Sequence, residues 1–216
     1  MKKDDRFIVI GDIHGCYDEL VELCKQLEAG IPIYTTGDLC DRGPNTKLVI
    51  DYIMKNGIMP VLGNHEKMWL DVIDSEMDFS VWLANGARAT IESYQTGIER
   101  GYMEYELDEE HEKFLRSLPL FIEVGDYIIS HAGFARGIPD SKVLNPDDWR
   151  YNCLWWRGPL EVIKGETQII GHTPHKEVEY GEGYINIDTG CVFGNKLTAI
   201  ELPSGKIYQV ISKQDK

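Results

Sequence analysis

The chain has 216 residues and a formal net charge of −14, from 36 acidic and 22 basic residues. This length suits one domain, and we expect residues 1–216 to form a single domain. Hydrophobic residues make up 43% of the chain, which excludes a disordered protein. The negative charge argues against binding to nucleic acid or to an anionic membrane, although bound metal ions can reverse the field within a site.

The cysteines and the apolar runs bear on the cellular compartment. The five cysteines are odd in number, and no pair has zinc-knuckle spacing, so we expect reduced thiols in a cytoplasmic protein. The first apolar run, Phe7–Ile10, is too short for the core of a signal peptide. No stretch approaches the roughly 20 apolar residues of a membrane-spanning helix, so we expect no contact with a membrane.

The first third of the chain alternates short apolar runs with amphipathic segments. Strands are predicted at Phe7–Ile10, Ile33–Thr36 and Met59–Leu62, because each run is short and ends in glycine followed by a polar residue. Helices are predicted at Tyr17–Leu27 and from Pro44 to Asn56, where apolar residues recur at helical spacing. This order predicts an α/β protein with a parallel sheet and right-handed crossovers.

The rest of the chain is predicted to be helical first and then rich in antiparallel strands. Residues 66–118 are expected to be mostly helical, with His111 solvated in an acidic stretch. Gly125-Asp126 is expected to form a hairpin turn, and Arg136–Asp148 a loop beside the site. The later strands are predicted at Phe121–Val124, Tyr127–Ser130, Thr167–Ile170, Tyr184–Ile187, Leu197–Glu201 and Ile207–Val210.

Polar residues follow five of these strands directly. They are Asp12 and His14; Asp38, Asp41 and Arg42; Asn64 and His65; His131; and His172. Taken singly, Asp12 could be a helix cap and His131 a hydrogen-bonded core histidine. Five strand ends of the same design instead indicate one site, because open α/β sheets bind ligands at the carboxyl ends of their strands. Carboxylate, imidazole and amide ligands suit divalent manganese, iron or zinc.

Several of these segments resemble the signature motifs of a known family. Gly11-Asp12-Ile13-His14-Gly15, Gly37-Asp38 through Gly43, Gly63-Asn64-His65-Glu66, His131-Ala132-Gly133 and Gly171-His172-Thr173-Pro174 resemble motifs of the PPP-type metallophosphatases. These belong to the calcineurin-like metallophosphoesterase superfamily, and the match is close to the compact bacterial and bacteriophage-lambda-type protein phosphatases. The resemblance runs from Phe7 to about Phe193.

The resemblance implies a fold, a metal centre and a nucleophile. The fold would be a central mixed β-sandwich with helices outside. Two divalent metals would be bound, Mn²⁺ being expected and iron, zinc, cobalt or nickel possible alternatives, with a bridging hydroxide as the nucleophile. One metal would be held by Asp12, His14 and Asp38, and the other by Asp38, Asn64, His131 and His172.

The resemblance also implies roles for residues that do not bind metal. His65 would be the general acid that protonates the leaving group, with Asp41 orienting it and raising its pKa. Arg42 and Arg157 would bind the phosphoryl oxygens, although Arg157 could instead be a surface arginine beside buried tryptophans. Apart from the resemblance, Glu66 is expected to support the surroundings of His65 or Asn64 and not to bind metal.

On these grounds we expect a phosphomonoesterase that acts on phosphoserine or phosphothreonine, and conceivably phosphotyrosine, in proteins, or on small phosphoesters. Leu62 departs from this pattern, because the protein phosphatases usually have an arginine there. The alternative is a symmetrical dinucleoside tetraphosphate hydrolase of the same superfamily, which tends to have a leucine. A non-catalytic binding module is a third reading, which the full set of ligands disfavours.

Overall fold

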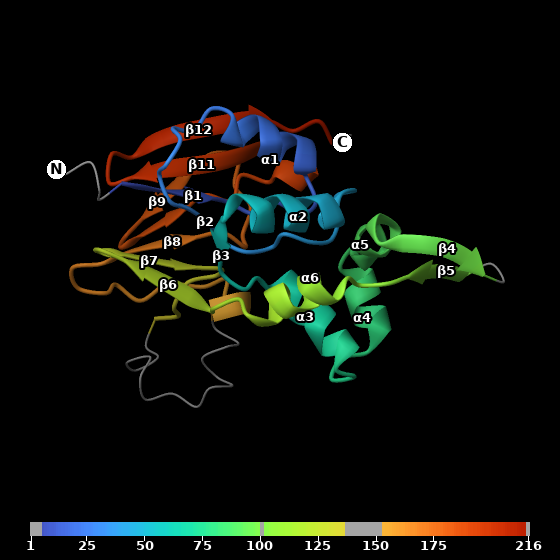
Figure 1. Ribbon diagram of the computed structural model, residues 1–216. Coiled ribbons are helices and arrows are strands. Elements are labelled where there is room, and N and C mark those ends of the chain that lie inside the picture. The colour runs from blue at the N-terminus through green and yellow to red at the C-terminus, as the bar shows by residue number, and fades with distance from the viewer. Residues whose placement is uncertain (1–5, 100–101, 137–152, 215–216) are drawn as a thin grey trace.

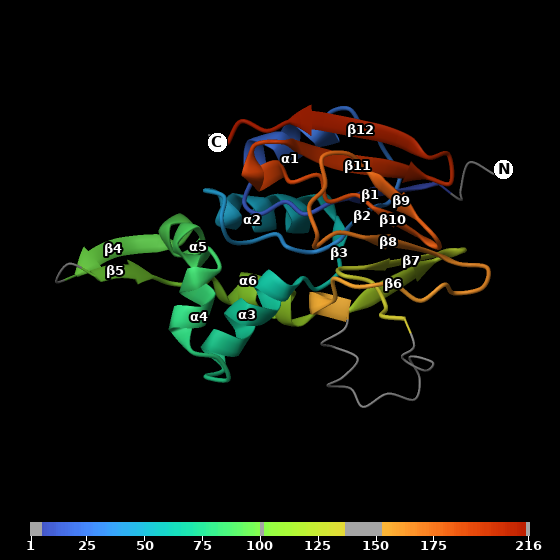
Figure 2. The ribbon, with the colours of Figure 1, turned by 180° about the vertical axis from the view of Figure 1, so that it is seen from behind.

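The computed structural model describes residues 6–99, 102–136 and 153–214. Two five-stranded sheets pack face to face, and helices lie outside the first sheet and at one end of the sandwich (Figures 1 and 2). This confirms the predicted α/β fold with a central mixed sandwich. Residues 137–148 of the predicted loop lie outside the described part of the chain.

The first sheet has the strand order β12-β11-β1-β2-β3. Its three N-terminal strands are parallel to one another, as predicted. The last two strands add to it as an antiparallel pair, with Ile10 of β1 opposite Ala199 of β11. The bounds are β1 (Phe7–Ile10), β2 (Ile33–Thr35), β3 (Met59–Pro60), β11 (Lys196–Leu202) and β12 (Lys206–Ile211).

The second sheet has the order β6-β7-β8-β10-β9. The strands β7, β8 and β10 are parallel, and the outer strands pair with them in antiparallel fashion. Gly125-Asp126 forms the predicted turn between β6 and β7, with φ of 59° at Gly125. The bounds are β6 (Phe121–Val124), β7 (Tyr127–Ser130), β8 (Thr167–Ile170), β9 (Glu179–Gly181) and β10 (Tyr184–Asn186). The sequence analysis missed β9, a three-residue edge strand.

Three apolar clusters stabilise this arrangement. Between the sheets, alternate residues such as Val9, Ile129 and Ile169 are completely buried. The outer face of the first sheet packs on α1 (Tyr17–Cys24) and α2 (Thr46–Asn56). Gly57, with φ of 63°, ends α2 in the left-handed conformation that favours glycine. The third cluster surrounds Trp69 and Trp82 in the helices α3 (Asn64–Ile73), α4 (Phe79–Ala84), α5 (Ala87–Ser93) and α6 (Glu109–Arg116).

Residues 66–118, which lie between β3 and β6 in the sequence, are less helical than predicted. After α5 the chain forms a hairpin of β4 (Gln95–Glu99) and β5 (Tyr102–Tyr105), which projects from the helical end (Figures 1 and 2). The prediction for His111 was also wrong, because its imidazole is buried between the Tyr94 hydroxyl at 2.7 Å and the Asp51 carboxylate at 3.0 Å. Within the described residues, no helix has the length and apolar character needed to cross a membrane.

Candidate active site: a buried carboxylate and histidine centre

The predicted residues gather where strands of both sheets end. His14, Asp38, Asp41, Arg42 and His172 all have positive φ values, between 46° and 68°. Only one other non-glycine residue in the described part of the chain, Ser75, does so. Such conformations are costly and cluster at functional sites, where the fold over-determines them. The strained backbone turns these side chains toward one centre.

One half of the centre consists of Asn64, His131 and His172. The Asn64 Oδ1 atom lies 2.7 Å from His131 Nε2 and 3.0 Å from His172 Nδ1. The two imidazole nitrogens are 3.1 Å apart, and His131 Nε2 lies 3.5 Å from Asp38 Oδ1. Four potential ligand atoms therefore face the same point.

The donor and acceptor roles of these atoms indicate that a cation fits at this point. His131 Nδ1 lies 2.8 Å from the Thr36 carbonyl, so that nitrogen must donate and Nε2 carries a lone pair in the neutral ring. Asn64 Oδ1 is also an acceptor. The lone pairs of His131 Nε2 and Asn64 Oδ1 therefore face each other, and at most one proton, on His172 Nδ1, lies between them. A divalent metal would satisfy all of them, and it would accept these ligand types.

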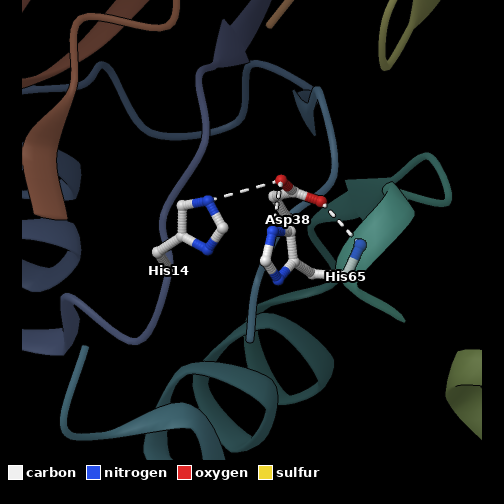
Figure 3. Close-up of side chains that lie close together, drawn as sticks. All are labelled: His14, Asp38 and His65. Atoms are coloured by element: carbon white, nitrogen blue, oxygen red, sulfur yellow. Dashed lines mark hydrogen bonds and ion pairs between the residues drawn. The ribbon is translucent and has the colours of Figure 1, made fainter. Parts of the chain in front are cut away.

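The other half of the centre contains Asp12, His14 and Asp38. The carboxylate of Asp38 lies between the imidazole of His14, 3.3 Å away, and the first turn of α3, whose His65 backbone N–H donates to it at 3.1 Å (Figure 3). His14 Nδ1 donates to the Cys40 carbonyl at 2.7 Å, which leaves Nε2 facing the centre. Asp12 accepts from the Thr36 hydroxyl at 2.8 Å and from the His172 backbone N–H at 2.9 Å.

Two glycines of the motifs are needed for these close approaches. A Cβ at Gly171 would overlap the carboxylate of Asp12, and a Cβ at Gly63 would overlap that of Asp38. No side chain fits between these backbones and the carboxylates, which explains the glycines that precede His172 and Asn64.

The buried charges of the centre also favour cations. Burial, together with the carboxylates of Asp188 and Asp38, raises the pKa of Asp12 well above its usual value. Burial opposes ionisation of Asp38, but the neighbouring histidines hold the pKa of that carboxyl well below its usual range. Burial lowers the pKa of His131, and it lowers that of His172 to about 3. Neutral imidazoles and an ionised Asp38 are the forms that bind metal.

Asp188 is a residue of this centre that the sequence analysis did not assign. It is buried, it follows β10, and it accepts from the Gly190 backbone N–H at 2.9 Å. The same signal that identified Asp12, an aspartate just past a buried strand, was present here.

The pair of His65 and Asp41 has the geometry expected of it. His65 Nδ1 lies 2.7 Å from Asp41 Oδ2, and His65 Nε2 faces the centre, 4.0 Å from Asp38 Oδ2. The carboxylate of Asp41 also accepts from Trp82 Nε1 at 2.9 Å and from the Thr90 hydroxyl at 2.8 Å. Burial lowers the pKa of His65, and the Asp38 and Asp41 carboxylates only partly oppose this. Asp41 thus acts in the predicted direction on the pKa of His65, but burial outweighs it.

Thr90 offers a test of this support. Its hydroxyl donates to Asp41 Oδ1 at 2.8 Å, and it accepts from the Asp41 backbone N–H at 2.9 Å. The isosteric change Thr90→Val leaves both groups buried without a partner, so we expect the free energy of unfolding to fall by about 1–3 kcal/mol in urea titrations. Thr167→Val, on a partly exposed strand position, is the control and should change it by less than about 0.5 kcal/mol. Equal effects of the two changes would contradict the role of Thr90.

The two predicted phosphate-binding arginines differ in their surroundings. Arg42 is part-buried, and its Nη1 donates to His14 Nε2 at 2.6 Å. A metal on that nitrogen would replace this hydrogen bond and release the guanidinium. Arg157 is exposed, and its charge lies close enough to His172 to lower the pKa of that imidazole. The structure thus places Arg42 against His14 and the exposed Arg157 near His172.

Glu66 has the supporting role that was predicted. Its carboxylate is fully buried and accepts four backbone N–H groups, from Asp38 at 2.9 Å, Leu39 at 2.7 Å, Cys40 at 3.1 Å and Gly63 at 3.0 Å. It therefore ties the loop that carries Asp38 to the first turn of α3.

Comparison with known proteins identifies the class. The sequence profile of the calcineurin-like phosphoesterases matches residues 5–207. The chain therefore belongs to the calcineurin-like phosphoesterase family and is a metal-dependent phosphoesterase with a dinuclear divalent metal site.

Curated relatives of this chain have a more specific name. The asymmetrical bis(5'-nucleosyl)-tetraphosphatase PrpE of Geobacillus sp. strain WCH70 is 34% identical, with 94% of this chain and 93% of that protein covered. The protein of the same name from Bacillus subtilis strain 168 is 29% identical over the same shares.

Solved structures support the fold. The crystal structure of a protein provisionally assigned as a diadenosine tetraphosphatase superposes with a TM-score of 0.72 at 23% identity, covering 99% of this chain and 96% of that chain. A cold-active protein-tyrosine phosphatase of Shewanella sp. reaches 0.63 at 18% identity, covering 96% and 78%.

These findings correct the predicted activity. The expectation of a protein serine/threonine phosphatase, and with it a phosphoprotein substrate, was wrong, because relatives that align over nearly the whole chain are named as dinucleoside tetraphosphatases. Leu62 agrees with this correction. Its apolar side chain is buried in the cluster formed by α3–α6, at the position where the protein phosphatases usually have an arginine. The alternative agrees with the class of substrate in the relatives' name but assumed symmetrical cleavage, whereas the relatives are named asymmetrical.

Proposed function

We propose that this chain hydrolyses dinucleoside tetraphosphates asymmetrically, to a nucleoside monophosphate and a nucleoside triphosphate. The observation that carries the proposal is a full set of carboxylate, amide and imidazole ligands in a chain that aligns over 94% of its length with relatives of that name. The net charge of −14 is no obstacle, because two divalent ions would make the site itself attractive to phosphate.

The proposed roles of the residues follow from the contacts around the centre. Asp12, His14 and Asp38 would hold one metal, and Asp38, Asn64, His131 and His172 the other, with Mn²⁺ as the first metal to test. Bound divalent ions supply Lewis-acid chemistry, polarising phosphoryl oxygens and lowering the pKa of water. Arg42, released from His14, would bind phosphoryl oxygens with its planar fork, and Arg157 would approach them from the other side.

His65 and Asp41 would handle the proton of the leaving group. The Asp41 carboxylate accepts from Nδ1–H of the ring, so in the protonated imidazolium the second N–H, at Nε2, faces the centre and would donate its proton to the bridging oxygen as the phosphoanhydride breaks. Trp82 and Thr90 fix that carboxylate, and thereby the ring.

The activity is tested by incubating the Mn²⁺-loaded protein with diadenosine tetraphosphate and separating the products by chromatography. We expect AMP and ATP in equal amounts, and a kcat/KM well above that on phosphoserine peptides. Two molecules of ADP would contradict the asymmetrical cleavage. A higher kcat/KM on the phosphopeptide would contradict the substrate class.

A further inference from the structure

An exposed aromatic ring lies beside the centre and has no role in the chemistry described above. Phe193 is the last residue of the short 3₁₀ helix η2 (Cys191–Phe193), which begins three residues after Asp188. Its side chain is 56% exposed, whereas Cys191 at the start of the turn is buried in the core. A scattered exposed phenylalanine needs no explanation, but this one lies next to a phosphate-binding arginine. The guanidinium carbon of Arg42 is 5.4 Å from the centre of its ring.

The turn that presents Phe193 is held firmly. Gly190 and Gly194, on either side, have φ of 69° and 80°, which favour glycine. The Phe193 and Asn195 backbone N–H groups both donate to the Gly190 carbonyl, at 3.1 and 3.2 Å. The Asn195 side chain donates to the Thr189 carbonyl at 2.7 Å and to the Lys176 carbonyl at 3.0 Å. Because the backbone of the turn is already fixed, little backbone freedom is lost when a ligand packs on the ring.

We propose that Phe193 is a stacking platform for a nucleobase of the substrate. This inference rests on the proposed function and specifies how the dinucleotide is recognised. Every nucleobase has a π-face, and stacking on an aromatic side chain is a common way to bind one without sequence preference. A phosphate held by Arg42 lies directly beside the ring, so the nucleoside that this phosphate carries can reach it.

The position of the platform also predicts which phosphate is attacked. Only a ribose separates a nucleobase from the phosphate that carries its nucleoside, so a base on Phe193 places that first phosphate at Arg42. Water then adds to this phosphorus, and its bond to the bridging oxygen breaks. The electron pair stays on the bridging oxygen of the departing nucleoside triphosphate, and one proton of the water is released. In H₂¹⁸O the label should therefore appear in the monophosphate, and label in the triphosphate would overturn this placement of the substrate.

Substitution of the ring tests the platform. For Phe193→Leu we expect the ratio of kcat/KM on diadenosine tetraphosphate to kcat/KM on inorganic tripolyphosphate, which has no base, to fall about 10-fold to 100-fold. Phe193→Trp should keep the ratio of the wild type. Tyr180→Leu is the control, because Tyr180 is equally exposed at 63% but lies on the edge strand β9. An unchanged ratio in Phe193→Leu, or an equal fall in Tyr180→Leu, would overturn the proposal.

A binding experiment separates this inference from the proposed activity. AMP and ribose 5-phosphate share the phosphate and the sugar, so their inhibition of p-nitrophenyl phosphate hydrolysis isolates the contribution of the base. We expect AMP to inhibit the wild type about 10-fold more strongly, and the difference to disappear in Phe193→Leu. No preference for AMP in the wild type would overturn the platform. A preference for AMP without hydrolysis of diadenosine tetraphosphate would overturn only the proposed function.

Discussion

Replacing Asp38 with asparagine is expected to lower kcat/KM on diadenosine tetraphosphate by at least about 10³-fold, because the change removes charge stabilisation worth several kcal/mol. Asp38 is the carboxylate nearest to both halves of the centre, 3.3 Å from His14 Nε2 and 3.5 Å from His131 Nε2. Without its charge neither half keeps its full set of ligands. Metal analysis by mass spectrometry should show a fall from about two divalent ions per chain to fewer than one.

Asparagine is chosen because it keeps the local backbone. Asp38 has φ of 50°, a conformation that asparagine adopts more readily than most other residues. The loss should therefore come from the ligand and not from misfolding, which circular dichroism can check. The matched control is Asp126→Asn at the exposed hairpin turn, which should retain the wild-type metal content and rate. A full metal content in Asp38→Asn would contradict the proposed bridging position.

His65→Asn is expected to lower kcat on alkyl phosphates, whose leaving groups are strongly basic, by about 10²–10⁴-fold, the range for one proton-transfer catalyst, with little change in KM. The reason is geometric, since His65 Nε2 faces the centre while Asp41 fixes Nδ1 at 2.7 Å. Asp41→Asn should cause a smaller loss, because it leaves the ring in place but removes the carboxylate that stabilises the protonated imidazolium.

A series of aryl phosphates separates a proton donor from a merely structural histidine. The loss in His65→Asn should grow as the leaving phenol becomes more basic, because a more basic leaving group depends more on protonation. An equal loss across the series would contradict the role as general acid. His175→Asn is the control, since that half-exposed imidazole pairs with Glu179 at 3.2 Å outside the centre.

The strand ends explain why much of the centre was predictable. Parallel strands bring their carboxyl ends to one edge of a sheet, so Asp12 and Asp38 meet after β1 and β2, and His131 and His172 meet after β7 and β8. The face-to-face packing of the two sheets then joins the two pairs, and this packing is not set by pairing within a sheet. The assignment of His65 and Asp41 needed the resemblance to a family, because nothing in their spacing distinguishes a proton donor from a metal ligand.

Other features depend on contacts that no local pattern records. Trp82 and Thr90 reach Asp41 from helices more than 40 residues away in the sequence, so their support could only be seen in the fold. The hairpin β4–β5 was not predicted, because its strands are short, their alternation of apolar and polar residues is weak, and the neighbouring segments are mostly helical. The substrate was misjudged because Asp41 and His65 were given more weight than Leu62. The buried, uncharged side chain of Leu62 departs from the protein-phosphatase pattern and was the more informative feature for the substrate.

We propose that this carboxylate and histidine centre cleaves dinucleoside tetraphosphates asymmetrically. The most direct test is the product chromatogram of diadenosine tetraphosphate after incubation with the Mn²⁺-loaded wild type and with Asp38→Asn at equal concentration. We expect equal amounts of AMP and ATP from the wild type and almost none of either product from the variant. ADP as the main product, or equal product formation by the two proteins, would contradict it.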